Sequence, residues 1–136
     1  MVCLSRRDRC KGRLGNGTWD DSSLPVDVTG LAGATQISAG GSWEDGHSCA
    51  VVTGGAAKCW GQGIAGQLGQ GTKVGSNVPE DVVSLTAASS ISAGGAHTCA
   101  VVSGGAAKCW GKNRWEELGD GTTYWSAVPV DVIAAP

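Results

Sequence analysis

The sequence predicts an all-β protein made of β-propeller blades, four-stranded antiparallel sheets arranged in an incomplete ring. Residues 47–83 and 97–133 align without a gap and agree at 22 of 37 positions, so one small unit is copied in tandem. The chain has 23 glycines and no Phe in 136 residues, a composition typical of frequent turns and small packed side chains. Short apolar runs between glycine turns recur about four times in each repeat of about 50 residues, which is the content of one blade.

An earlier, partial copy is visible through a Gly-x-Leu-Gly-x-Gly-Thr motif that is followed each time by a proline at a constant distance. The motif lies at residues 12–18, 66–72 and 116–122, and the prolines are Pro25, Pro79 and Pro129. We therefore expect one array, divided into an atypical or truncated start at residues 1–11, the end of a first repeat at 12–34, a second repeat at 35–88 and a third at 89–136.

Each repeat is expected to open with a short strand, at residues 34–39 and 89–93, where small polar and apolar residues alternate. The apolar runs 48–52 and 56–60 flank Thr53-Gly54-Gly55 and predict a tight β-hairpin, which recurs in the next repeat. The segments 25–28 and 129–132 predict short outer strands beginning at proline, because a missing N–H does least harm at the first residue of an edge strand.

The Gly-x-Leu-Gly-x-Gly-Thr stretches contain too many glycines for helix interiors and are expected to be structured loops. Their leucines are expected to plug the core, and the tryptophan that ends each hairpin belongs to the same repeating frame. The residues of this frame are Leu14, Leu68, Leu118, Gly69, Gly71, Gly119, Gly121, Trp60, Trp110, His47 and His97.

Charge and hydropathy exclude several functions. The net charge of −2 combines +4 in residues 1–13 with −6 in the remainder, which argues against nucleic acid as the partner of the repeats. No apolar run approaches the ~20 residues that a membrane-spanning helix needs, so no membrane partner is expected.

The cysteines of the two good repeats are placed for disulfides. With a loop at residues 53–55, Cys49 lies opposite Cys59, and Cys99 lies opposite Cys109 in the same way. Reduced core cysteines and metal ligands remain alternatives at this stage. Two disulfides would indicate an extracytoplasmic or secreted protein. The chain start lacks a signal core, so either residue 1 is not the natural start or the protein is cytoplasmic.

Catalytic and metal sites are not expected, and no cofactor is implied. Zinc bound by His47 and Cys49, or by His97 and Cys99, would lack a fourth ligand. We instead expect each histidine ring to bond backbone at a blade edge. No nucleophile, base and orienting group converge, and the acidic pairs Glu44-Asp45 and Glu116-Glu117 are expected to be solvated surface.

These motifs resemble the regulator of chromosome condensation repeat family, whose blades carry Gly-x-x-His-Thr/Ser, Cys-Trp-Gly and Gly-Gln-Leu-Gly-x-Gly-Thr. The resemblance covers residues 12–136 and implies a ring of about seven blades, of which this chain holds about two and a half. On the same offset, Ser5 and Arg6 stand where Cys59 and Trp60 would be. The plant UV-B photoreceptor also resembles this family, but Gly95 stands where its tryptophan would be.

The resemblance implies a non-catalytic scaffold that binds another protein, and we expect it to be part of a larger secreted or surface bacterial protein. The alternatives are a guanine-nucleotide exchange factor or chromatin-associated regulator of the same family, a structural arc that associates with copies of itself through open strand edges, and a gene fragment with no independent role.

The repeats differ mainly in their loops, which is where binding repeats acquire specificity. Aromatic and cationic residues are concentrated there and are the candidate binding residues. They are Trp43, Arg114, Trp115, Tyr124 and Trp125. The alternative is that Trp115 and Trp125 fold over the blade edge as local packing.

Overall fold

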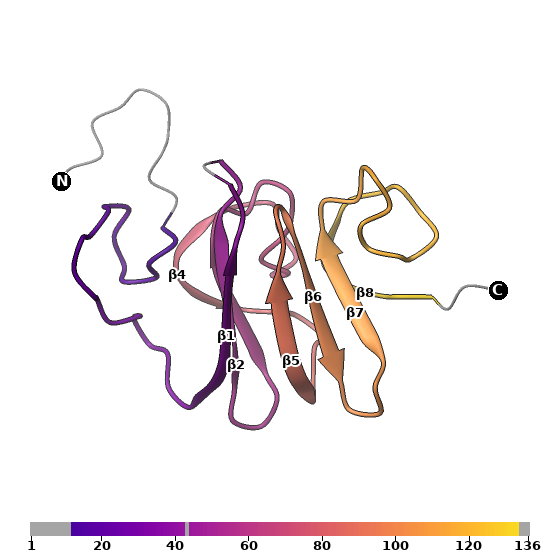
Figure 1. Cartoon of the computed structure of the whole chain (residues 1–136), viewed down its shortest axis with the longest axis horizontal. Coiled ribbons are helices and arrows are strands. Elements are labelled where there is room, and N and C mark those ends of the chain that lie inside the picture. The colour runs from indigo at the N-terminus through magenta and orange to yellow at the C-terminus, as the bar shows by residue number, and fades with distance from the viewer. Residues whose placement is uncertain (1–11, 43, 134–136) are drawn as a thin grey trace.

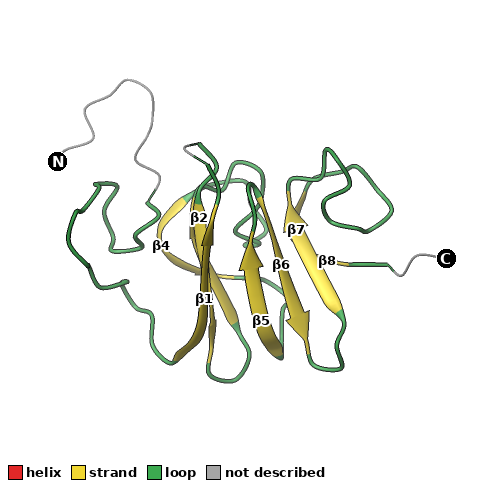
Figure 2. Cartoon of the chain, viewed as in Figure 1, coloured by secondary structure: helices red, strands yellow, loops and turns green. Residues whose placement is uncertain are grey.

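The computed structural model describes residues 12–42 and 44–133, and it confirms the all-β fold class. The described residues form two four-stranded antiparallel sheets, with strand orders β1-β2-β3-β4 and β5-β6-β7-β8 (Figure 2). Blade 1 consists of β1 (Ala34–Gly40), β2 (His47–Val52), β3 (Ala57–Gly61) and β4 (Ser76–Asp81). Blade 2 consists of β5 (Ala88–Ala93), β6 (His97–Val102), β7 (Ala107–Gly111) and β8 (Ser126–Asp131).

The two blades stand side by side, with β1 and β2 of blade 1 packed against β5 of blade 2 (Figure 1). A buried apolar cluster fills the space between them, since neither sheet can hide both of its faces alone. Its members are Cys49, Val51, Ala57, Cys59, Leu68, Val82, Leu85, Ala88, Ile91, Ala100 and Trp110. We call the face of a blade that points toward the next repeat its trailing face, and the opposite face its leading face.

The central hairpins have the register expected from the sequence. Cys49 pairs with Cys59 and Cys99 with Cys109, and each pair forms a disulfide with Cα atoms 4.1 Å apart. The close spacing is that of directly opposed residues in an antiparallel pair. The two blades also share the positions of their β-bulges, so the repeat extends to the details of the backbone.

The outer strands differ from the prediction. β8 begins at Ser126 and runs through Pro129, and β4 likewise contains Pro79, so proline lies inside these strands. Both are edge strands, where a missing N–H does not interrupt the sheet. The predicted strand at residues 25–28 is absent, because the described residues include no third strand of that repeat with which it could pair.

Some predictions fall outside the described residues: those for residues 1–11, including Cys3 and Cys10, and that for Trp43. Within residues 12–42 and 44–133, no helix has the length and hydropathy required to cross a bilayer.

Candidate protein-binding site

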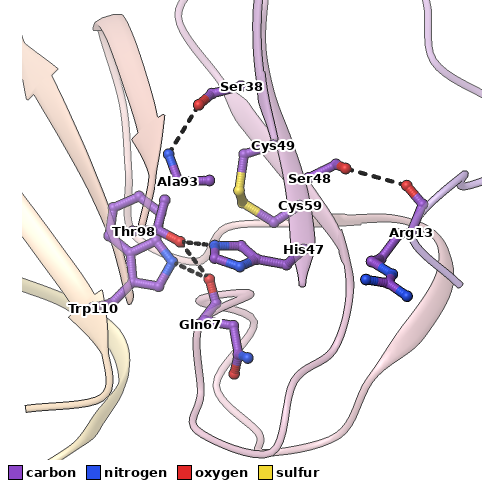
Figure 3. Close-up of a disulfide and its surroundings, with 10 residues drawn as sticks. All are labelled: Arg13, Ser38, His47, Ser48, Cys49, Cys59, Gln67, Ala93, Thr98 and Trp110. Atoms are coloured by element: carbon purple, nitrogen blue, oxygen red, sulfur yellow. Dashed lines mark hydrogen bonds between the residues drawn. A yellow bond between two sulfur atoms is a disulfide. The ribbon is translucent and has the colours of Figure 1, made fainter. Parts of the chain in front are cut away.

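A chain of hydrogen bonds fastens blade 1 to blade 2. The indole Nε1 of Trp110 donates to the carbonyl of Gln67 at 2.9 Å, and the hydroxyl of Thr98 donates to the same carbonyl at 2.8 Å (Figure 3). His47 Nε2 lies 2.7 Å from the Thr98 hydroxyl, and it must be the donor because that hydroxyl hydrogen is already used. We call this arrangement the clasp. The sequence did not predict this contact between the His47 ring and a side chain of the next blade.

A second clasp holds residues 12–18 against blade 1. Trp60 Nε1 donates to the carbonyl of Arg13 at 2.9 Å, and Ser48 Oγ donates to the same carbonyl at 3.1 Å. Residues 12–18 therefore occupy on blade 1 the place that residues 66–72 occupy on blade 2. The segment also bonds β4, where Asn77 accepts from the amide of Gly17 at 3.0 Å.

The clasp explains two of the motif glycines. Gly15 and Gly69 each have φ of +69°, and a Cβ added to either would lie 2.7 Å from the Nε1 of the tryptophan that it faces, Trp60 or Trp110. Only glycine allows this backbone to approach an indole so closely. The leucine that precedes the second glycine of each motif points into the core: Leu68 and Leu118 are fully buried, and Leu14 is half-buried.

Burial in the clasp lowers the pKa of His47 from 6.5 to about 4. The backbone carbonyl and the charge of Asp45 act in the opposite direction, and His97 acts in the same direction as burial. His47 is therefore neutral at pH 7, and its Nε2 carries the hydrogen that is donated to Thr98.

The side chains considered for metal binding are engaged in the frame. The sulfurs next to His47 and His97 are all in disulfides, and the described ranges contain no group of three or more His, Cys, Asp or Glu side chains able to hold an ion. Of the acidic pairs, Glu44 and Glu116 are exposed, and the Glu117 carboxylate accepts the amide of Trp115 at 2.7 Å.

The loop between β7 and β8, residues 112–125, carries four of the five predicted binding residues. Trp115 is 76% exposed, Tyr124 80% and Trp125 41%. The Arg114 guanidinium lies 5.4 Å from the centre of the Trp115 ring, and Lys73 Nζ lies 5.9 Å from that of Trp125. Lys73 comes from the corresponding loop of blade 1, residues 62–75, so that loop reaches Trp125 of the next repeat. We call these four residues together with Lys73 the aromatic patch.

Asn113 organises this loop, and sequence reasoning missed it. Its side chain is fully buried; its Nδ2 donates to the carbonyls of Thr122 and Tyr124 at 2.8 and 3.2 Å, and its Oδ1 accepts the amide of Leu118 at 2.9 Å. The available signal was a difference between repeats, because Gly63 stands at the matching position of blade 1.

Asp120 completes the support of the loop. Its carboxylate accepts bonds from the amide and hydroxyl of Thr122 and from Asn113. Desolvation acts to raise the pKa of Asp120, but these hydrogen bonds outweigh it and hold the pKa below its usual value. The aromatic side chains therefore project from a loop that is fixed from within.

Two four-stranded blades joined by buried clasps define a partial β-propeller, with no closed ring among residues 12–42 and 44–133. The family model of the regulator of chromosome condensation (RCC1) repeat matches residues 58–101. The human E3 ubiquitin-protein ligase HERC2 is 34% identical in an alignment of 89 residues that covers 60% of this chain and 2% of that protein, and its mouse counterpart is 33% identical in an alignment of the same length. The chain is therefore similar to RCC1 repeat proteins over these residues.

Solved structures share the fold of this chain. Human WBSCR16 matches with a TM-score of 0.74 and 27% identity, over 91% of this chain and 33% of that one. Prp20p of Saccharomyces cerevisiae matches with a TM-score of 0.73 and 18% identity, over 93% of this chain and 33% of the yeast chain, which shows the fold alone. The chain thus spans about a third of these structures and a small fraction of HERC2.

Proposed function

We propose that this chain is a non-catalytic protein-binding module whose partner contacts the aromatic patch. The observation that carries the proposal is the exposure of Trp115 and Tyr124 on a loop held by buried Asn113. Large aromatic side chains on a fixed support lose little conformational freedom on binding and are typical anchors of interfaces. The other groups suited to chemistry, such as His47 and the four cysteines, are engaged in structural contacts.

Relatives support a protein partner. A yeast RCC1 protein, Prp20, has been solved bound to Kap60, in a structure that resembles this chain with a TM-score of 0.73 and 19% identity. Propellers of this fold can therefore present surfaces to other proteins. Fold alone does not select the partner. We therefore assign the specific contacts to loop 112–125, because this loop differs most from the corresponding segment of the other repeat, residues 62–75.

The proposal includes a location outside the cytoplasm, in a larger secreted or surface protein of bacterial origin. It is supported by the two disulfides, because such bonds persist in oxidising compartments. Mass measurement of the protein taken from its own cells, with free thiols blocked at lysis, should find Cys49, Cys59, Cys99 and Cys109 unmodified. Alkylation of all four would contradict this location.

The binding proposal is tested with Trp115→Ala/Tyr124→Ala. Cross-linking in cells, followed by identification of the attached protein, should give one specific adduct with the unmodified chain, and this adduct should be lost in the double variant. Ile64→Ala/Val74→Ala is the matched control, since both residues are exposed on the corresponding loop of blade 1. If the double variant and the control retain the same adduct, the patch is not the binding site.

A chromatin-associated regulator is the second candidate, favoured by the likeness to Prp20p, whose binding to Gsp1p and histones is described. The charge of −6 outside residues 1–13 is compatible with a basic histone partner. Titration of the chain with purified histones separates the two candidates. Salt-sensitive binding that is unchanged by Trp115→Ala would favour the regulator.

A further inference from the structure

The cations of the repeats fall into two groups, one paired and one unpaired. Five of the ten Lys and Arg residues of the chain follow residue 13. Two of these form matching ion pairs, Lys58 with Asp81 at 2.7 Å and Lys108 with Asp131 at 2.6 Å. The other three form no ion pair with any described residue, and all lie in the loops that follow β3 and β7; they are Lys73, Lys112 and Arg114. The unpaired cations are therefore concentrated in the two loops that carry the aromatic patch.

The outer positions of these loops stay exposed even where the next repeat is present. Blade 1 is covered by blade 2, yet Ile64 and Val74 in its loop remain 59% and 63% exposed. Arg114 and Tyr124 stand at the matching positions of the loop of blade 2. Their exposure is therefore a property of this loop in each repeat, whatever stands beside blade 2.

Two aromatic rings accompany the cations of the patch. The Arg114 guanidinium lies 5.4 Å from the centre of the Trp115 ring, and Lys73 Nζ lies 5.9 Å from that of Trp125. Both distances lie within the range of about 6 Å over which a ring face attracts a cation. Lys73 belongs to blade 1 and Trp125 to blade 2, so the second pair spans the junction of the two described blades. Each pair presents an apolar ring and a positive charge side by side.

The acidic side chains of loop 112–125 are not ion-paired with these cations. Glu117 accepts the amide of Trp115 at 2.7 Å, and Asp120 accepts the amide and hydroxyl of Thr122. Glu116 is exposed, and no ion pair joins it to another described residue. The cations of the patch are thus available to carboxylates of another molecule, and such complementarity favours one partner over others.

We infer that the aromatic patch recognises an acidic segment of its partner, in which carboxylates lie beside apolar side chains. This inference rests on the protein-binding function proposed above and names the chemistry of the bound segment. The carboxylates pair with Lys73 and Arg114, and the apolar side chains pack on Tyr124 and Trp125. Because the chain outside residues 1–13 has a charge of −6, an acidic segment is repelled by the rest of the repeats and attracted only here.

A phage library of random short peptides tests the inference, with the unmodified chain as bait. The selected peptides should be enriched in Asp and Glu together with aromatic or aliphatic residues. Fluorescence polarisation of the labelled peptides should show binding that weakens as salt is added, because salt screens exposed charges. Lys73→Gln/Arg114→Gln should weaken this binding about tenfold.

Two control variants separate charge from other effects. Lys73→Arg/Arg114→Lys keeps both positive charges and should bind the peptides as the unmodified chain does. Ala56→Asp/Ala106→Asp lowers the net charge by the same amount as the glutamine pair. Both alanines are exposed and precede β3 and β7, at the opposite end of these strands from the loops of the patch (Figure 1). This variant should bind as the unmodified chain does.

Several outcomes would overturn the inference: selection of no peptide, selection of neutral or basic peptides, or equal binding by the glutamine pair and the alanine-to-aspartate control. A single-stranded oligonucleotide that binds as tightly as the best peptide would also overturn it, because the patch would then recognise polyanions in general. The proposed function is decided separately, by the adduct that Trp115→Ala/Tyr124→Ala should lose. A partner that is lost in that variant but retained by Lys73→Gln/Arg114→Gln would leave the binding site in place and remove only its acidic specificity.

Discussion

Blade 1 and blade 2 share almost the same hairpin sequence, yet they stand in different surroundings. The trailing face of blade 1 is covered by blade 2, while that of blade 2 is open, so Val51 is buried and Val101 is exposed although both follow Cys-Ala in identical contexts. The difference shows that burial in this fold is set by the neighbouring repeat and not by the local sequence. Contacts between adjacent repeats therefore carry much of the stability, as in other repeat arrays.

The largest expected effect distinguishes the two tryptophans of the frame. Trp110→Ala should lower the free energy of unfolding by about 3–5 kcal/mol, because it leaves a cavity between the blades and breaks the clasp. Trp60→Ala should cost less, since Trp60 lies outside the cluster between the blades and holds residues 12–18. Urea denaturation of both variants measures the difference. An equal or greater loss for Trp60→Ala would contradict this interpretation.

The next effect concerns pH and the two histidines. As the pH falls from about 6.5 to about 4, the unfolded chain binds a proton at His47 and the folded chain does not, so stability is lost in this window. The loss should be at most about 3 kcal/mol. His47→Gln should flatten the dependence of unfolding free energy on pH across this window, whereas His97→Gln should preserve it. A similar slope in both variants would show that His47 is not its source.

The disulfides should differ in accessibility more than in the stability that they contribute. Each closes a loop of similar length and should contribute about 2–3 kcal/mol. Cys49 and Cys59 are both fully buried, while Cys99 is half-buried at the open face. Mild reduction followed by alkylation and mass analysis should therefore label Cys99 and Cys109 first. Earlier labelling of Cys49 and Cys59 would contradict the difference in burial.

The smallest expected effect distinguishes the loop at residues 112–125 from the corresponding loop of blade 1, residues 62–75. Asn113→Gly, which introduces the residue of blade 1, should cost about 1–2 kcal/mol by removing the bonds inside loop 112–125. Hydrogen exchange should show faster exchange at Leu118, whose amide loses its acceptor. Gly63→Asn is not an equivalent change, because a Cβ at that position collides with the carbonyl of Val74. Unchanged exchange at Leu118 would mean that Asn113 does not organise the loop.

Local pattern predicted much of this fold from the sequence. Alternation and glycine turns located the central hairpins, and the opposed positions of Cys49 and Cys59 followed from the loop at residues 53–55. Contacts between repeats were not accessible in this way. The partner of His47 is Thr98, 51 residues away, and a strand at residues 25–28 requires a paired neighbour that the local sequence cannot reveal.

The candidate site was predicted only in part, because some of its contacts also join residues that are distant along the chain. Differences between the copies drew attention to Trp115, Tyr124 and Trp125, since a repeated frame makes departures visible. The role of Asn113 depends on a loop that folds back on itself, so that one amide reaches both Thr122 and Tyr124. The spacing of these residues along the chain does not reveal that the loop folds back on itself.

The acceptor in both clasps is a main-chain carbonyl, contributed by Arg13 in one and Gln67 in the other. Residues with unrelated side chains serve equally well there, because recognition between units requires only a backbone bend with glycine beside the indole. Newly duplicated units can thus join the array without compensating substitutions in their neighbours. The exposed loops are left free to diverge.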